Sequence, residues 1–163
     1  MKSRGGELGA THNFTNGVSF IGSYTFLDAE ISENATNEGN KLARIPENAA
    51  ALWVNYAFQD PQFEGLSIGA GVRYVDERFS DSANTESRIA PEITVFDASV
   101  SYDWNDWSAT LAARNIADET DVTFCSPGVS DVFPLIPTGN TAEAGGCALS
   151  EGRTVSLSLT RTF

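Results

Sequence analysis

The chain has 163 residues, which suits one domain, and its 10 basic and 22 acidic residues give a net charge of -12. This excess of negative charge argues against a nucleic-acid partner, because nucleic acids are themselves anionic. The chain contains no run of about 18 apolar residues, so a transmembrane helix is excluded.

Along the chain, the strongest pattern is an alternation of apolar and polar residues with a period of two, typical of β-strands with one apolar face. From Phe96 to Trp104, aromatic and aliphatic residues alternate with Asp and Ser. Near the end, Val155, Leu157 and Leu159 alternate with Ser and Thr. No segment keeps a helical period, so we expect an all-β chain. The predicted strands are roughly 3-13, 18-28, 48-58, 65-76, 93-104, 107-116 and 152-163.

The links between these strands alternate between short and long. Short turns are expected at Asn16-Gly17, at 59-64 and at Asn105-Asp106, whereas the long links cover about 29-47, 77-92 and 117-151. Barrels of the bacterial outer membrane have tight periplasmic turns and long outer loops. We therefore predict an antiparallel up-and-down meander in the wall of a transmembrane β-barrel. The alternative is a soluble β-sandwich whose core holds the aromatic residues.

Aromatic residues of the apolar face gather at two levels, as expected where rings prefer the boundary between lipid and water. The short turns would lie on the periplasmic side and the long links on the outer side. The predicted periplasmic belt is Tyr56, Phe58, Trp104, Trp107 and Phe163, and the predicted outer belt is Tyr24, Phe26, Tyr74 and Phe96.

A charged cluster is predicted on the opposite, lumen-facing side. A two-residue turn at Asn105-Asp106 makes the numbers of paired residues sum to 211, which places Asp97 opposite Arg114. Arg73 should lie at a similar height on the neighbouring strand. A wet pair of this kind usually contributes less than ~1 kcal/mol. A solvated or plug-facing wall is the alternative to direct contact with a ligand.

Cys125 and Cys147 both lie in the last long link. We expect a disulfide between them because the periplasm and the exterior are oxidising, with two free thiols as the alternative. Closing a loop of this size would stabilise the fold by roughly 3 kcal/mol. His12 is the only histidine and is interpreted as a surface residue. We therefore predict no catalytic residues, no metal site and no cofactor, so the chain is not expected to be an enzyme.

Several motifs, in order along the whole chain, resemble the C-terminal barrel of TonB-dependent outer-membrane receptors, in particular the ferric-siderophore receptors. A cysteine pair just before the final strand is similar to the last loop of that family. The motifs are Ser3-Arg-Gly-Gly-Glu7, Tyr24-Thr-Phe-Leu-Asp28, Arg44-Ile-Pro-Glu47, Gly69-Ala-Gly-Val-Arg-Tyr-Val75, Val95-Phe-Asp-Ala-Ser-Val-Ser-Tyr102, Arg114-Asn-Ile-Ala-Asp118 and Gly152-Arg-Thr-Val155.

The resemblance implies a place in a larger receptor. Members of the family have a 22-stranded barrel with a plugged lumen, so residues 1-163 are interpreted as the C-terminal third of the barrel, without the plug and the N-terminal strands. The implied function is uptake of ferric siderophores through the outer membrane. The implied partners are the ferric siderophore, membrane lipid, TonB through the missing N-terminal region, and the barrel assembly machinery, for which Phe163 would end the recognised strand. The residues that contact the ligand are not predicted.

Two positions depart from the family pattern. Asn115-Ile-Ala-Asp118 stands where Asn-Leu-Phe-Asp is usual, and Arg161 stands where an aromatic residue is usual. An arginine at the periplasmic boundary can extend its charged group toward water. Two functional alternatives remain open: a TonB-dependent receptor for vitamin B12, a carbohydrate or another metal chelate, and a small self-contained β-barrel that binds a ligand.

Overall fold

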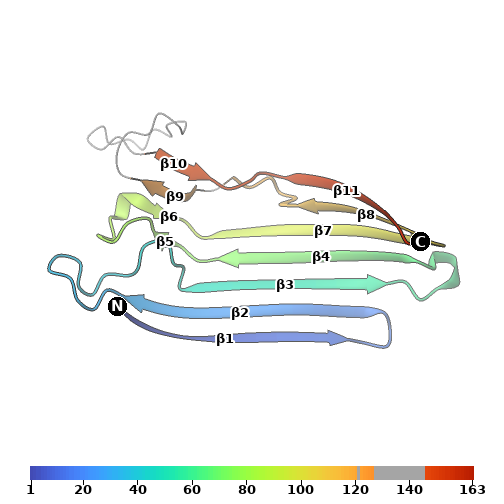
Figure 1. The fold of residues 1–163 in the computed structure, drawn as a ribbon, viewed down its shortest axis with the longest axis horizontal. Coiled ribbons are helices and arrows are strands. Elements are labelled where there is room, and N and C mark those ends of the chain that lie inside the picture. The colour runs from blue at the N-terminus through green and yellow to red at the C-terminus, as the bar shows by residue number, and fades with distance from the viewer. Residues whose placement is uncertain (121, 127–145) are drawn as a thin grey trace.

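Seven long strands form one antiparallel sheet in a computed structural model that describes residues 1–120, 122–126 and 146–163. Each strand pairs with the next long strand along the chain, so the predicted up-and-down meander is confirmed (Figure 1). The predicted ends lie within two residues of the observed ones. In sheet order the strands are β1 (Lys2–Asn13), β2 (Val18–Glu30), β3 (Asn48–Ala57), β4 (Leu66–Val75), β7 (Ile93–Trp104), β8 (Trp107–Arg114) and β11 (Thr154–Arg161).

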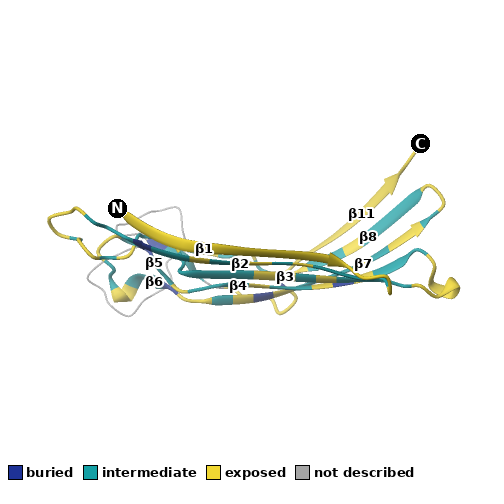
Figure 2. Ribbon diagram, turned by 90° about the horizontal axis from the view of Figure 1, so that it is seen from below, coloured by how far each residue is buried: buried dark blue, intermediate teal, exposed yellow. Residues whose placement is uncertain are grey.

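The sheet is a single curved layer (Figure 2). Val100, Leu111 and Leu157 on its apolar face are 47%, 49% and 74% exposed, so no second layer of the described chain covers them. Five of the seven long strands have 10 to 13 residues, enough to cross a bilayer when tilted, and β8 and β11 have 8 each. The geometry therefore fits a barrel wall and contradicts the alternative of a sandwich with an aromatic core.

Tight turns close one end of the sheet. Gly17 and Gly65 have φ angles of 88° and 83°, and a Cβ on either would collide with the carbonyl oxygen of Ala57 or Asp103 on a neighbouring strand. At the third turn Asn105 takes the positive φ, and Trp104 pairs with Trp107. The two-residue turn that fixes the register is thus confirmed.

The opposite end carries short elements that the sequence pattern did not predict. They are β5 (Arg78–Phe79), β6 (Ile89–Ala90), β9 (Val122–Ser126), β10 (Gly146–Leu149) and the single-turn 3-10 helix η2 (Glu86–Arg88). A second 3-10 turn, η1 (Pro61–Phe63), lies at the tight-turn end between β3 and β4. Segments of two to five residues are too short to display a period.

Apart from Gly69 in the middle of β4, the buried described residues lie at this outer end. They are Ala29, Ser80, Ala90, Val95, Asn115, Cys125 and Cys147. The core of the chain is therefore the junction between the sheet and its long links. No helix in the described ranges is both long and apolar enough to span a membrane.

Candidate functional site at the outer end

Arg73 and Asp97 form a two-pronged ion pair on the polar face of β4 and β7, the face that is predicted to line the lumen. Nε and Nη2 of Arg73 donate to the two carboxylate oxygens of Asp97 at 2.8 and 3.1 Å. The side chain of Asp97 is 12% exposed, whereas that of Arg73 is 51% exposed. Planar pairing of this type orients both groups. The arginine can therefore still present its remaining nitrogen to the lumen.

Arg114 lies next to this pair without joining it. The register of β7 and β8 follows the predicted sum of 211 from Trp104–Trp107 to Ala98–Ala113. Beyond that point Oδ1 of Asp97 accepts a hydrogen bond from the backbone N–H of Asn115 at 2.9 Å. Arg114 lies within electrostatic reach of Asp97. Its guanidinium has no hydrogen-bond or ion-pair partner in the described part of the chain.

Asn115, which the sequence analysis noted only within a motif, holds the start of the last long link. It is 4% exposed and adopts a φ of 52°, a conformation that asparagine tolerates better than most residues. Its side chain donates to the carbonyls of Glu119 and Glu151 at 2.7 and 3.1 Å and accepts from the N–H of Glu119 at 3.0 Å. The two ends of the link therefore meet at one buried amide.

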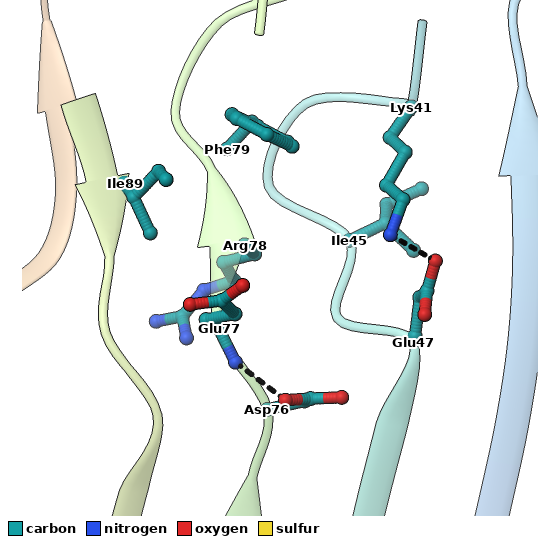
Figure 3. Close-up of a pocket in the computed structure, with 8 residues that line it drawn as sticks. All are labelled: Lys41, Ile45, Glu47, Asp76, Glu77, Arg78, Phe79 and Ile89. Atoms are coloured by element: carbon teal, nitrogen blue, oxygen red, sulfur yellow. Dashed lines mark hydrogen bonds and ion pairs between the residues drawn. The ribbon is translucent and has the colours of Figure 1, made fainter. Parts of the chain in front are cut away.

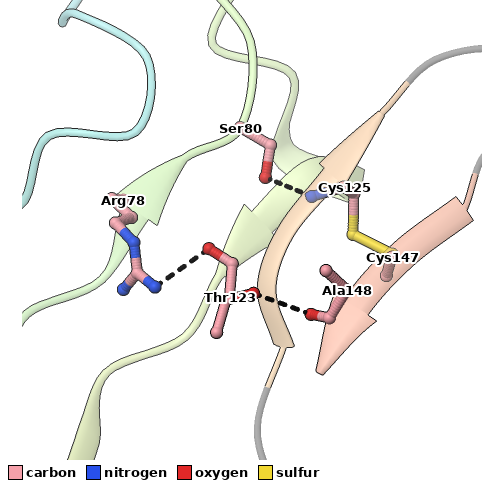
Figure 4. Close-up of a disulfide and its surroundings, with 6 residues drawn as sticks. All are labelled: Arg78, Ser80, Thr123, Cys125, Cys147 and Ala148. Carbon is pink, nitrogen blue, oxygen red and sulfur yellow. Dashed lines mark hydrogen bonds between the residues drawn. A yellow bond between two sulfur atoms is a disulfide. The ribbon is translucent and has the colours of Figure 1, made fainter. Parts of the chain in front are cut away.

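The predicted disulfide between Cys125 and Cys147 is present and joins directly opposed residues of β9 and β10 (Figure 4). The N–H of Cys125 donates to the hydroxyl of Ser80 at 2.9 Å, and both residues are buried. Nη2 of Arg78 donates to the carbonyl of Thr123 at 2.9 Å. The link between β4 and β7 thus packs against the disulfide-bonded pair.

The other two outer links also hold each other. The N–H and carbonyl of Lys41 bond to the side chain of Asn84 at 2.7 and 3.0 Å. The guanidinium of Arg44 lies 4.6 Å from the centre of the Phe124 ring. All three outer links are therefore connected by specific contacts and form one assembly.

Asp81 stabilises the link between β4 and β7 from within. Burial by itself would raise the pKa of Asp81, but hydrogen bonds from Thr85 and Arg88 outweigh it and hold that pKa below its usual value. The Arg88–Asp81 pair is 2.9 Å long. The carboxylate thus prefers to be charged in the folded loop.

A small recess lies under the assembly (Figure 3). Its volume is about 70 Å³, room for a few water molecules but far less than the ~300–1,000 Å³ of a drug-sized ligand site. A hydrogen bond from the Asn48 amide is the main reason that the pKa of Asp76 lies below its usual value. The recess is therefore too small for a chelate. It is lined by Lys41, Ile45, Glu47, Asp76, Glu77, Arg78, Phe79 and Ile89.

A larger recess opens on the lumen-facing side. Its volume is about 330 Å³, within the range of small-molecule sites. Arg73, Arg114 and Asn115 line it together with Thr123 and Glu151. Two of the three residues of the predicted lumen cluster therefore border a space of ligand size.

The predicted aromatic belts occupy the two ends of the strands. At the tight turns, Trp104 stacks with Trp107 at 6.4 Å, and Tyr56 meets Phe58 at 4.9 Å. At the outer end, the hydroxyl of Tyr24 donates to Asn48 at 2.6 Å. The hydroxyl of Tyr74 donates to Glu92 at 2.9 Å. Their role as a membrane girdle, shared with Phe26, Phe96 and Phe163, stays a prediction.

In the described ranges, no group of three or more His, Cys, Asp and Glu side chains is arranged to hold a metal ion. His12 is exposed and makes an edge contact with Phe14 at 4.4 Å.

Comparison with known proteins gives consistent similarities. The sequence model of the family described as TonB dependent receptor-like, beta-barrel matches residues 1–116. The ferrichrome outer membrane transporter/phage receptor of Escherichia coli is 38% identical over 133 residues, which cover 82% of this chain and 17% of that protein. The ferrioxamine B receptor of Salmonella typhimurium is 32% identical over 77% of this chain and 18% of its own length.

Solved structures show the same fold. The ferric yersiniabactin uptake receptor of Yersinia pestis superposes with a TM-score of 0.77 at 19% identity, covering 96% of this chain and 23% of that one. The siderophore receptor PiuA of Acinetobacter baumannii gives a TM-score of 0.72 at 25% identity, covering 96% and 21%. This chain thus spans about a fifth of the length of the proteins that it matches.

Proposed function

The chain belongs to the TonB-dependent receptor-like β-barrel family, and from this premise we propose that it is part of an outer-membrane receptor that takes up ferric-siderophore complexes. The observation that carries the proposal is the 38% identity to a ferrichrome transporter over most of the chain. The proposed place of residues 1-163 is the C-terminal part of the barrel, with the plug and the other strands supplied by the rest of the receptor.

In this proposal the chain has three tasks. The apolar face of the seven strands contacts membrane lipid, and the polar face lines the lumen. The interlocked outer links shape the outer opening through which the chelate arrives. The recess at Arg73 and Arg114 borders the path of the chelate, and arginine suits the oxygen atoms of such a ligand because its donors form a planar fork.

The remaining partners follow from the family. TonB would act through a region outside this chain, and the barrel assembly machinery would recognise β11 together with Phe163. The chain is proposed to have no enzymatic activity, because transport here means binding and passage of an intact complex.

The proposal is tested with the full-length receptor that contains this chain. A strain that lacks the receptor should lose growth on ferrichrome or ferrioxamine B as the only iron source, and the restored gene should recover it. A TonB-deficient strain is the control for energy coupling. Unchanged growth on every ferric siderophore tried would contradict the proposal.

A second candidate substrate class is favoured by one relative. The metal-pseudopaline receptor of Pseudomonas aeruginosa is 30% identical over 58% of this chain. If the receptor takes up a metal chelate other than a ferric one, the same deletion strain should lose uptake of that metal and not of iron.

A further inference from the structure

Arg161 occupies an unusual position on the outward face of the last strand. It pairs in register with Trp107, at the end of the sheet where the tight turns lie (Figure 1). Its guanidinium carbon lies 5.4 Å from the centre of the Trp107 ring and 4.9 Å from that of Phe163. Trp107 in turn stacks on Trp104. A cation is thus placed within the aromatic belt of the apolar face.

This cation has no counter-ion in the described part of the chain. The guanidinium of Arg161 makes no hydrogen bond or ion pair there, and neither Asp103 nor Asp106 of the facing hairpin pairs with it. The aromatic rings can stabilise the charge over the guanidinium plane, but they accept none of its five N–H donors. The edge of the guanidinium therefore needs an oxygen acceptor from outside the chain.

The level of Arg161 in the membrane indicates the chemical class of this acceptor. A ring belt on the outward face marks the boundary between hydrocarbon and headgroups. The groups at that level with a negative charge and several oxygens are lipid phosphates, and a guanidinium matches two phosphate oxygens at once. A bare water contact would satisfy the donors without neutralising the charge.

We propose that Arg161, held between Trp107 and Phe163, binds the phosphate of a glycerophospholipid in the periplasmic leaflet. The proposal rests on the barrel placement given above and goes beyond it, because it assigns a lipid site to one rim of the wall.

The test is lipid binding to the full-length receptor in detergent, measured by native mass spectrometry with dioleoyl phosphatidylglycerol. Arg161→Gln removes the charge and should weaken the binding of the phosphatidylglycerol molecule at this site about fivefold, as expected for one basic group at a lipid surface. Arg161→Lys should retain most of the binding that depends on charge alone. The matched control is Arg153→Gln, just before the other end of the same strand and beside Asp118, which should bind phosphatidylglycerol like the unaltered receptor.

Two results would overturn the proposal. One is equal phosphatidylglycerol binding by the unaltered receptor and Arg161→Gln. The other is that dioleoylglycerol, which lacks the phosphate, binds to the unaltered receptor as tightly as phosphatidylglycerol. This measurement uses no variant, so it does not depend on whether a variant folds. A failure of siderophore uptake would leave both lipid measurements unaffected, so the two proposals are tested separately.

Discussion

Asp97 is the residue that joins three segments on the lumen-facing side. Its two carboxylate oxygens accept from Arg73 on β4 and from the backbone of Asn115 after β8. The register that brings Asp97 toward β8 could be predicted from one two-residue turn. The contact with Asn115 could not, because it depends on a positive φ that only the folded backbone reveals.

Replacing Asp97 by Asn should destabilise the receptor by about 1 kcal/mol, because the ion pair with a half-exposed Arg73 is lost and the amide cannot accept at both oxygens. Urea unfolding of the full-length receptor in lipid vesicles measures the change. Asp103→Asn, an exposed carboxylate on the same strand, is the control and should change the free energy of unfolding little. Equal effects of the two variants would contradict the role given to Asp97.

Asp81 predicts a dependence of loop order on pH. Its folded-state pKa is lowered, so its stabilising contribution is present above the unfolded pKa and is lost as pH falls through the folded pKa. Below about pH 4, hydrogen exchange of residues 81–88, corrected for the intrinsic rate, should therefore increase. In Asp81→Asn the corrected rate should already be high at neutral pH and change little on acidification. A native loop that exchanges equally at pH 6 and pH 3 would be inconsistent with this assignment.

At the scale of elements, the outer links behave as one unit because each contacts another through buried or directed groups. Ser80 is the clearest case, since its hydroxyl accepts from the amide of Cys125. The sequence predicted the disulfide but not this contact, because Ser80 and Cys125 are 45 residues apart and belong to no periodic segment.

Ser80→Ala should leave the Cys125 amide buried and unpaired, at a cost of about 1–3 kcal/mol. The expected result is a faster reduction of the Cys125–Cys147 disulfide by dithiothreitol, measured by thiol labelling and mass. Ser82→Ala, an exposed neighbour, should reduce at the native rate. If Ser80→Ala is reduced no faster than Ser82→Ala, the packing of β9 against this link does not protect the disulfide.

The tight turn before β2 makes a second prediction for an element. Gly17→Ala forces a side chain into a positive φ and against the carbonyl of Ala57, so it should cost about 1–3 kcal/mol. Thermal unfolding of the full-length receptor measures the loss. Gly9→Ala in the middle of β1 is matched to it, because a Cβ there meets nothing within 4 Å. A larger effect at Gly9 than at Gly17 would refute the steric argument.

At the scale of the molecule, most of the long strands were predictable because they repeat a period of two over 8 residues or more. Val100, Leu111 and Leu157 are apolar residues that are exposed in the structure. This exposure is reasonable only if lipid, and not a protein core, covers their side chains. The lumen recess was less predictable. It is built from residues of β4, β7, β8 and the last link, which no local pattern brings together.

In the full-length receptor, residues of alternate parity should face lipid and an aqueous lumen across a single wall. The most direct test introduces single cysteines into the full-length receptor in vesicles, with the Cys125–Cys147 disulfide intact, and measures labelling by a membrane-impermeant thiol reagent. Cysteines at Ser99, Ala112 and Ser158 should react, whereas those at Val100, Leu111 and Leu157 should be protected by lipid. Labelling that shows no alternation, or the reverse alternation, would contradict the account.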